Sequence, residues 1–485
     1  MSTAIGRNDP RYATLRRSRN LRWPASDAEA AAFIQICEDS KALAAALQQT
    51  VNQGRRPTIR SGGHCYEDFV VNNPGGTILD LSLLSDANAV AREERYRISP
   101  GKQLGDVYLD LYKRYGVTIP AGSCYSVGAG GHISGGGYGV LSRLYGLTVD
   151  WLSAVEILTV NTQGKVVPLR VDKTQHPDLF RASRGAGGGN FGVITSFLFD
   201  QLPPAPQEVV AGGLSFEWNG MTEDRFVDIV QTYGHYFETR GKDRDTWGLF
   251  SILNLSHASG RGFGIGLQFC NPDGTCSDLT PLHEFLALFD SFKPSRRPPV
   301  RRFWLDATVG DHSGSGGMRA KYKSAYMKRN FTKDEAHCIY KHLRRTPDKA
   351  DLRGGVLAVD SYGGAVNRAS LVNETSIAQR ASTLKLQFMS FWSRPEDDAA
   401  RLGWLRDFYS DLYTNANVDS RFSGTPYPGD FYEGCYINYP DADMLSHSFW
   451  PQLYYGIGEL YPFLQGVKRR YDPNNVFHHA MSIRP

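Results

Sequence analysis

The sequence has no apolar run that approaches the roughly 20 residues of a membrane-spanning helix. Its N-terminus carries charges where a secretory signal peptide would have an apolar core. The formal net charge of +4 over 485 residues is too small to indicate a nucleic-acid partner, and no run of basic residues alternates with aromatic ones as in a strand-binding groove. We therefore expect a cytoplasmic protein with neither a membrane nor a nucleic-acid partner.

Cysteine is also scarce, with seven residues scattered along the chain. An odd number without regular spacing does not indicate a disulfide scaffold. One local disulfide stays open, between Cys270 and Cys276, because these residues flank the turn sequence NPDGT. No CxxC pair and no His-x-x-x-His pair occurs, so we expect no metal site.

The first 200 residues alternate between predicted helices and strands. A length of 485 residues itself predicts two or more lobes. Alanine-rich turns predict a helix within 24–54, and an amphipathic pattern predicts another over 104–116. Residues 154–169 read as a hairpin that turns at Gln163 and Gly164. Shorter strands are predicted at 57–61, 77–84 and 96–100.

The pattern changes after the proline-rich segment at 201–207. From 209 to about 393, long apolar strands are mixed with helices, which predicts a second lobe built on an antiparallel sheet. From about 430 on, the chain returns to short strand and helix. The sequence therefore predicts an α+β fold with two lobes.

Three glycine-rich segments precede residue 200, at 60–64, 121–146 and 184–199. The third contains G-x-G-x-x-G, but a predicted helix precedes it and a strand follows it. A dinucleotide-binding fingerprint needs the opposite order, which argues against that fold. Glycine costs conformational entropy on folding, so three such loops favour close approach of backbone to an extended, flat, anionic ligand.

Five motifs occur in a fixed order: RSGGH, GSCYSVGAGGHISGGGYG, DLFRASRGAGGGNFGVIT, YINYPDAD and YDPNNVF. Together they resemble the motif series of the berberine-bridge-enzyme-like branch of the vanillyl-alcohol-oxidase flavoproteins. The tail FHHAMSIRP is most similar to bacterial sugar and antibiotic-tailoring oxidases such as hexose oxidases. The resemblance implies a two-lobed PCMH-type FAD-binding fold whose second lobe is an antiparallel sheet covered by helices. It divides the chain into a first FAD-binding part (1–207), a substrate-binding domain (208–429) and a C-terminal FAD-binding part (430–485).

The resemblance also implies that FAD is attached covalently at two residues. The histidine of RSGGH, His64, corresponds to the family's link to the flavin 8α-methyl, and the cysteine of GSC, Cys124, to the link at flavin C6. Either residue alone would be read as a turn histidine or a small buried side chain; inside these loops, together, they favour covalent flavin. The other residues expected to bind the cofactor are Arg60, Ser61, Gly62, Gly63, Cys65, Ser123, Val127, Gly128, Gly131, His132, Gly137, Gly139, Gly189, Asn190, Gly192, Val193 and Asn438.

The catalytic residues implied by the family are two tyrosines and two strand residues. Tyr439 of NYPD corresponds to the base, and Tyr138 of GGGYG assists it. Since a free tyrosine has a pKa near 10, the base needs a nearby cation or hydrogen bond. Lys385, which shares a strand face with Gln387, is the candidate cation. Plant members that form bridged alkaloids have a glutamate where this chain has Gln387, a difference that argues against bridge formation.

The expected function is oxidation of a hydroxyl group on a sugar, oligosaccharide or glycosylated metabolite, with O2 reduced to hydrogen peroxide. The small side chain of Val127 resembles the family's oxygen-reactive members. Oxidative cyclisation or C–H oxidation of a non-sugar compound stays open, as does a non-catalytic flavin-binding protein. We expect a monomer or weak homodimer, and packing or surface roles for His478 and His479. Aromatic residues proposed for sugar stacking are Trp304, Tyr322, Tyr362 and Trp392.

Overall fold

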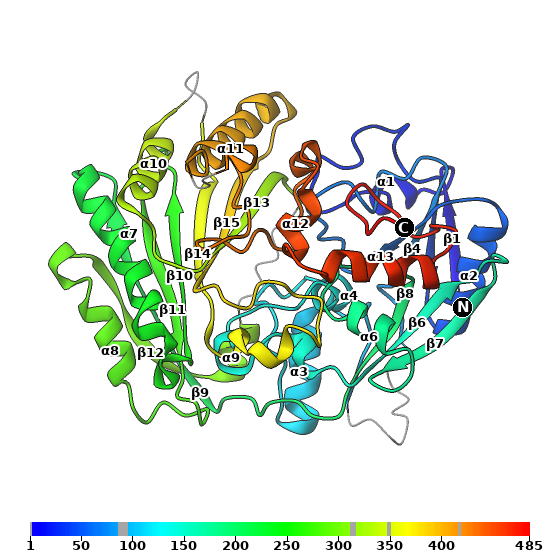
Figure 1. The fold of residues 1–485 in the computed structure, drawn as a ribbon, viewed down its shortest axis with the longest axis horizontal. Helices are drawn as coiled ribbons and strands as arrows, with labels where there is room; N and C mark the ends of the chain where they lie inside the picture. Colours follow the sequence, from blue (N-terminus) through cyan, green and yellow to red (C-terminus); the bar gives the residue numbers. More distant parts are fainter. Residues whose placement is uncertain (1, 86–95, 311–316, 347–350, 416–418) are drawn as a thin grey trace.

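The computed structural model describes residues 2–85, 96–310, 317–346, 351–415 and 419–485. Two four-stranded sheets carry the N-terminal part of the chain, and one seven-stranded sheet carries the middle part. The seven-stranded sheet begins at Glu208, the residue at which the sequence places the second domain. Figure 1 shows the two parts side by side, with both chain ends on the side of the smaller sheets.

The first four-stranded sheet is mostly parallel, and β1 is its antiparallel edge. Its spatial order is β1 (Ser2–Gly6), β2 (Phe33–Cys37), β4 (Thr77–Asp80) and β3 (Pro57–Arg60). The second sheet is antiparallel. Its order is β5 (Tyr96–Ile98), β8 (Val193–Phe199), β6 (Ala154–Val160) and β7 (Val166–Asp172).

One sequence-based prediction is wrong in this part. The helix expected within 24–54 forms only from α2 (Ser40–Asn52), and the preceding FIQIC is strand β2. Phe33, Ile34 and Ile36 pair with strands on both sides, and this tertiary pairing outweighs the helical preference of the neighbouring alanines. The side chain of Asp39 accepts a hydrogen bond from the Ala42 backbone N–H at 2.7 Å and fixes the start of the helix.

The predicted antiparallel lobe is confirmed, since every neighbouring pair in the large sheet is antiparallel. The strands, in spatial order, are β12 (Ser295–Phe303), β9 (Glu208–Glu217), β11 (Gly262–Phe269), β10 (Leu249–Ser256), β14 (Gly355–Ser361), β15 (Leu384–Trp392) and β13 (Arg319–Met327). Strand β13 is therefore an edge.

Helices cover the outer face of this sheet, away from the smaller sheets (Figure 1). They are α7 (Glu223–Glu238), α8 (Thr280–Ala287), α10 (Lys333–Arg344) and α11 (Asp398–Leu412). Helices of the other part are α1 (Tyr12–Leu15), α3 (Leu104–Tyr115), α4 (Ala129–Ser134), α5 (Ser142–Tyr145) and α6 (Pro177–Ser183). Helix α9 (Trp304–Val309) follows β12. Among the residues in the described ranges, no helix is both long and apolar enough to cross a membrane.

The C-terminal segment returns to the smaller sheets through α12 (Trp450–Tyr455) and α13 (Leu460–Tyr471). The short strand expected after residue 430 does not form as an element; Tyr432 makes only an isolated bridge to Met327. The disulfide left open by the sequence is also not formed, since Cys270 and Cys276 are both free and buried thiols.

Candidate functional site

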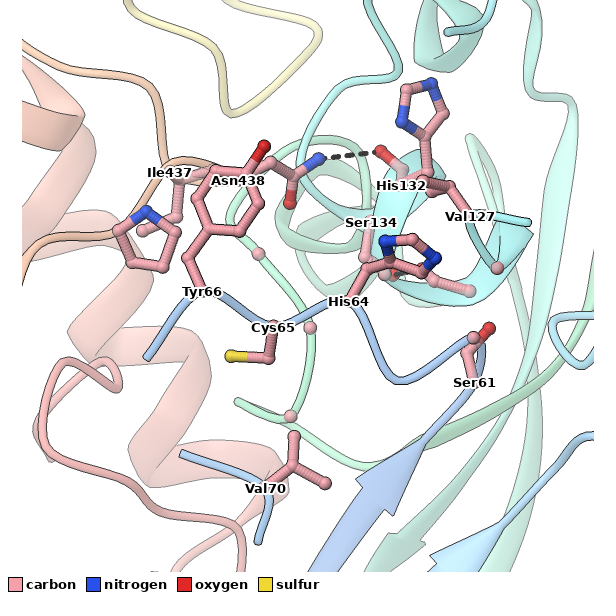
Figure 2. Close-up of a pocket in the computed structure, with 18 of the residues that line it drawn as sticks. Ser61, His64, Cys65, Tyr66, Val70, Val127, His132, Ser134, Ile437 and Asn438 are labelled. Carbon is pink, nitrogen blue, oxygen red and sulfur yellow. Dashed lines mark hydrogen bonds between the residues drawn. The ribbon is translucent and has the colours of Figure 1, made fainter. Parts of the chain in front are cut away.

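A cavity of about 620 Å³ lies where the glycine loops meet the large sheet, a volume typical of small-molecule and cofactor sites. Its wall combines segments that are far apart in the sequence. They are the turn after β3, the loops around Gly128 and Gly188, the inner faces of β10, β13, β14 and β15, and the segments around Tyr439 and His479. Figure 2 shows His64, His132 and Asn438 among the residues that line this space.

The turn after β3 is held tightly by its neighbours. Ser61 Oγ donates to the Pro100 carbonyl at 2.5 Å. Gly62 lies against the second glycine loop so closely that a Cβ would be 2.3 Å from the Gly128 nitrogen, while Gly63 has a φ of +73°. Arg60 lines the cavity, but its guanidinium is neutralised by the buried carboxylate of Asp80 at 2.6 Å.

His64 and Cys124, the two expected attachment residues, come together around one hydroxyl. His64 Nε2 is 3.1 Å from Ser126 Oγ, and Cys124 Sγ is 3.8 Å from the same oxygen. Burial lowers the pKa of His64 to about 4, so its imidazole is neutral near pH 7. Ser126 was not predicted from the sequence; it lies two residues after Cys124 and has no motif of its own.

Most predicted cofactor-binding residues line the cavity, with two exceptions. Val193 is fully buried in β8, and Gly137 packs against Thr148, whose Cβ would be 2.6 Å from an added methyl. Both lie behind the wall. The residues of the prediction that do form the wall, besides those described above, are Cys65, Ser123, Val127, Gly131, His132, Gly139, Gly189, Asn190, Gly192 and Asn438.

His132 and Asn438 join two of these segments. Asn438 Nδ2 donates to the His132 carbonyl at 2.9 Å (Figure 2), and the Gly122 N–H donates to His132 Nε2 at 3.0 Å. Burial, followed by the charge of Lys385, lowers the pKa of His132 to about 4. His132 is therefore neutral, and its Nε2 acts as a hydrogen-bond acceptor.

Lys385 is fully buried behind Tyr439. Its Nζ donates to Tyr439 Oη at 3.2 Å and to Asp360 Oδ2 at 2.8 Å. The same ammonium lies 4.2 Å from the ring centroid of Tyr439 and 4.7 Å from that of Tyr138. Burial, and then the charge of Asp360, raise the pKa of Tyr439 well above its usual range. The lysine therefore contacts the tyrosine as predicted, but Asp360, which the sequence analysis missed, opposes its effect.

Tyr138 holds its hydroxyl away from this group. Its Oη donates to the Ser361 carbonyl at 2.5 Å, while its ring lies beside the ammonium of Lys385. Gln387 does face the cavity. Its Nε2 donates to Tyr66 Oη at 2.8 Å. Tyr66 stacks on Tyr322, with ring centroids 3.5 Å apart.

The structure also bears on the two C-terminal histidines and on the aromatic residues. His478 is exposed, as expected of a surface residue, and His479 is a packing residue; both also line the cavity. The imidazole of His479 stacks on Phe69 at 4.5 Å, and its buried Nδ1 has no hydrogen-bond partner. Of the aromatic residues proposed for sugar stacking, Tyr322 lines the cavity. Trp304, Tyr362 and Trp392 are buried in the core away from it.

Comparisons with known proteins agree with this geometry. Residues 31–170 match a family model described as an FAD binding domain, and residues 435–484 match one described as berberine and berberine like. The chain is 32% identical to hexose oxidase from Chondrus crispus, over 98% of this chain and 93% of that protein. It is 34% identical to aclacinomycin-N/aclacinomycin-A oxidase from Streptomyces galilaeus, over 91% and 82%. A structure of a glycopeptide hexose oxidase complexed with teicoplanin superimposes with a TM-score of 0.89 and 34% identity, over 100% of this chain and 99% of that one.

The chain belongs to the berberine-bridge-enzyme-like family. It has the PCMH-type fold of these flavoproteins and is an FAD-dependent oxidoreductase.

The cavity of this family member fits FAD by two observations on the chain itself. A Cβ added to Gly131 would meet no protein atom within 4 Å, so this glycine leaves open space at the wall. The unpartnered Nδ1 of His479 is a buried polar atom that a ligand in the cavity can satisfy. The glycine turns meanwhile supply backbone N–H groups of the kind that bind phosphate oxygens.

Proposed function

We propose that this protein is an oxidase with bicovalently attached FAD, which converts a carbinol of a sugar on a largely apolar scaffold into a carbonyl. O2 accepts the two electrons and two protons and leaves as hydrogen peroxide. The observation that carries the proposal is the contact of Lys385 Nζ with Tyr439 Oη, 3.2 Å long, at the wall of the cavity that His64 and Cys124 also line.

The position of His64 and Cys124 supports two covalent links. The flavin 8α-methyl and C6 are on the same benzenoid ring, so two attachment residues must lie close together. Both side chains contact Ser126 Oγ, which meets this requirement. The neutral imidazole of His64 has a free lone pair for bond formation, because burial lowers its pKa to about 4.

Tyr439 is the proposed base for the substrate hydroxyl. When bound, FAD supplies the hydride acceptor, N5 of the isoalloxazine, and the route of electrons to O2. Tyr439 Oη accepts a hydrogen bond from the ammonium of Lys385, and hydrogen bonding to the charged form favours the phenolate. The ammonium of Lys385 compensates the negative charge of the phenolate, which then takes the hydroxyl proton of the substrate. Tyr138 keeps the ammonium in place through its ring and is a positioning residue.

The wall of the large sheet supports an apolar scaffold next to the reacting sugar. The side chains on one face of the large sheet point to the cavity. Most of those on β10 and β15 are apolar: Phe250, Ile252, Met389 and Phe391. The stacked rings of Tyr66 and Tyr322 add a flat aromatic surface with hydroxyl groups, which suits a pyranose or an aromatic ring. A free hexose would leave the apolar wall in contact with water.

The test is a screen of the purified holoenzyme for peroxide release. The panel contains free hexoses, oligosaccharides, alkyl and aryl glycosides and glycosylated polyketides of matched concentration. We expect glycosides with an apolar aglycone to give the highest kcat/KM, and Tyr439→Phe to lower the rate of flavin reduction at least a hundredfold without releasing the flavin. Intact mass of the denatured chain should exceed the apo value by one FAD. Full activity of Tyr439→Phe, or a pigment lost on denaturation, would contradict the proposal.

A further inference from the structure

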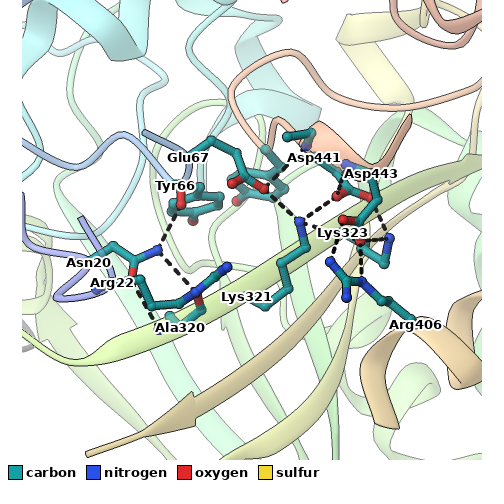
Figure 3. A network of polar contacts seen from close by, with 12 residues as sticks. Asn20, Arg22, Tyr66, Glu67, Ala320, Lys321, Lys323, Arg406, Asp441 and Asp443 are labelled. Atoms are coloured by element: carbon teal, nitrogen blue, oxygen red, sulfur yellow. Dashed lines mark hydrogen bonds and ion pairs between the residues drawn. The ribbon is translucent and has the colours of Figure 1, made fainter. Parts of the chain in front are cut away.

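A cluster of six charged side chains, four of them buried, lies at the edge strand β13 (Figure 3). Its members carry three negative and three positive charges. They are Glu67, Asp441, Asp443, Lys321, Lys323 and Arg406. Four of them, Glu67, Asp441, Lys321 and Lys323, have side chains at most 4% exposed. A balanced but deeply buried cluster gives little net stability compared with apolar packing, so its presence needs another explanation.

The contacts of the cluster centre on two lysines of the edge strand β13. Lys321 Nζ contacts Glu67 Oε1 at 2.7 Å and Asp441 Oδ1 at 2.6 Å. Lys323 Nζ contacts the other oxygen of Asp441 at 2.5 Å and Asp443 at 3.0 Å. One strand of the large sheet is thus bonded to two separate segments, the one that follows His64 and the one that follows Tyr439.

Each of these segments carries a cavity tyrosine next to its anion. Glu67 directly follows Tyr66, and Asp441 follows Tyr439 by two residues. Between the lysines stands Tyr322, whose side chain points to the opposite face of β13 because neighbours on a strand alternate. The two segments therefore cross the sheet edge, with their anions on one side of β13 and their tyrosines on the cavity side, where the three rings meet.

The contacts among these rings depend on that alignment. Tyr66 lies with its ring centroid 3.5 Å from that of Tyr322 and 5.3 Å from that of Tyr439. Asn20 adds a neutral tie on the same edge, since its Nδ2 donates to the carbonyls of Tyr66 at 2.8 Å and Ala320 at 3.1 Å (Figure 3). The cluster, by contrast, joins the segments to β13 through hydrogen bonds between charged groups, which are stronger than neutral ones.

We propose that the buried cluster is a positioning device: Glu67, Lys321, Lys323 and Asp441 fix Tyr66 and Tyr439 against β13 and so set the place of the base. The inference rests on the proposed function for its kinetic part, since Tyr439 is the base only under that proposal. The ring geometry that the cluster sets belongs to the folded chain alone and can be measured without a substrate.

The test variant is the double substitution Glu67→Gln with Lys321→Met, which removes one charge of each sign and leaves Asp441 paired with Lys323. The matched control is Arg319→Gln with Asp398→Asn, which removes another ion pair of β13, one that joins the strand to α11. Both are studied as flavinylated holoenzyme with thermal midpoints recorded. If the double variant does not fold, Glu67→Met alone takes its place, because it removes the contacts of Glu67 with Lys321 and the Ala442 N–H while Lys321 stays paired with Asp441.

Two readouts separate positioning from a merely structural role. In rapid-reaction mixing with the best substrate of the screen, we expect the cluster variant to lower the limiting rate of flavin reduction at least tenfold with less than a threefold change in substrate Kd. Tyr439→Phe, added to the cluster variant, should then lower the limiting rate of flavin reduction by a factor less than a tenth of its factor in the wild type, because the tyrosine is already displaced. The control pair should stay within twofold of the wild type.

The second readout is the near-ultraviolet circular dichroism of the stacked tyrosines, assigned from the difference between wild type and Tyr322→Leu. We expect the cluster variant to lose this band and the control to keep it. A folded, flavinylated cluster variant with the wild-type band and the wild-type reduction rate would overturn the proposal, as would an equal loss in the control. If no substrate reduces the wild-type flavin, the proposed function fails, and the dichroism alone then decides the positioning role.

Discussion

Lys385→Met is the substitution that most directly tests the electrostatics of the base. Lys385 is fully buried, with Nζ 3.2 Å from Tyr439 Oη. At an effective dielectric constant near 20, an ammonium at this distance stabilises a phenolate by about 5 kcal/mol. Loss of the lysine removes this stabilisation of the phenolate, so the pKa of Tyr439 rises further above its usual range.

The effect on rate follows from this shift. Since about 1.4 kcal/mol corresponds to a factor of ten in an equilibrium constant, losing about 5 kcal/mol of phenolate stabilisation would by itself lower the phenolate fraction, and the rate at fixed pH, by roughly three to four orders of magnitude. The phenolate of the variant is a stronger base and accepts protons faster. With a Brønsted coefficient near one half, this recovers about half of the loss in the logarithm of the rate. We therefore expect flavin reduction in Lys385→Met to be about a hundredfold slower near pH 7.

The assay is the rate of flavin reduction in rapid mixing across pH 6–10, with Asp360→Asn as the opposing variant. In the wild type the rate should rise with pH, because burial and Asp360 raise the pKa of Tyr439. Lys385→Met should move this rise to higher pH, and Asp360→Asn should move it to lower pH, since it removes an anion. Each variant leaves one buried charge unpaired, which costs about 3–5 kcal/mol of stability, so both are assayed well below their thermal midpoints. Shifts in the same direction, or an unchanged profile in Lys385→Met, would refute this account.

Three further predictions concern the cofactor cavity. Single substitutions His64→Ala and Cys124→Ala should each keep the flavin through denaturation, whereas the double substitution should release it, as mass spectrometry of the denatured chain will show. Gly131→Val should fold with the thermal midpoint of the flavin-free wild type but take up less flavin, because its side chain enters open space in the cavity. Gly62→Ala, by contrast, should lower the yield of folded protein, because its Cβ would be 2.3 Å from the Gly128 nitrogen. Burial lowers the pKa of His479 to about 3, so the unfolded chain binds the additional proton between about pH 6.5 and 3, and stability falls as pH falls through this window. His479→Phe should show a smaller loss of thermal midpoint between pH 6.5 and 4; an equal loss would contradict this role of the imidazole.

Local sequence signals predict much of the fold. Helix α3 ends at Gly116, which has the left-handed conformation expected of a C-terminal glycine, and the hairpin of β6 and β7 turns at Gly164 with a φ of +73°. The helix predicted across β2 fails because the structure of this segment depends on distant strands and not on local signals. Its FIQIC sequence becomes a strand because β1 and β4 are available on either side, information that no window of neighbouring residues contains.

The residues of the candidate site also fall into two groups, those that local motifs predict and those that only tertiary packing brings together. Compact motifs predict four residues of the site: His64, Cys124, Tyr138 and Tyr439. Asp360 has no motif, and its importance comes from its cross-strand neighbour Lys385, which the register of β14 and β15 places opposite it. Tyr66 was overlooked although it lies two residues after His64. Its partners are Gln387 and Tyr322, more than 250 residues away in the sequence, and only the packing of the two parts brings them together.

Under the proposed function, the glycine loops hold the cofactor and the large sheet faces the substrate. Cofactor-binding groups come from glycine turns in which an added methyl often meets backbone, as at Gly62 and Gly139, so few substitutions are tolerated there. Side chains toward the substrate stand on alternate positions of β10 and β15. Their neighbours Leu253 and Leu386 carry the core on the other face of the sheet. Cavity-facing residues such as Ile252 and Met389 can therefore be exchanged with little loss of core packing, and specificity can change at low cost in stability while the charged cluster at β13 keeps the proposed base in place.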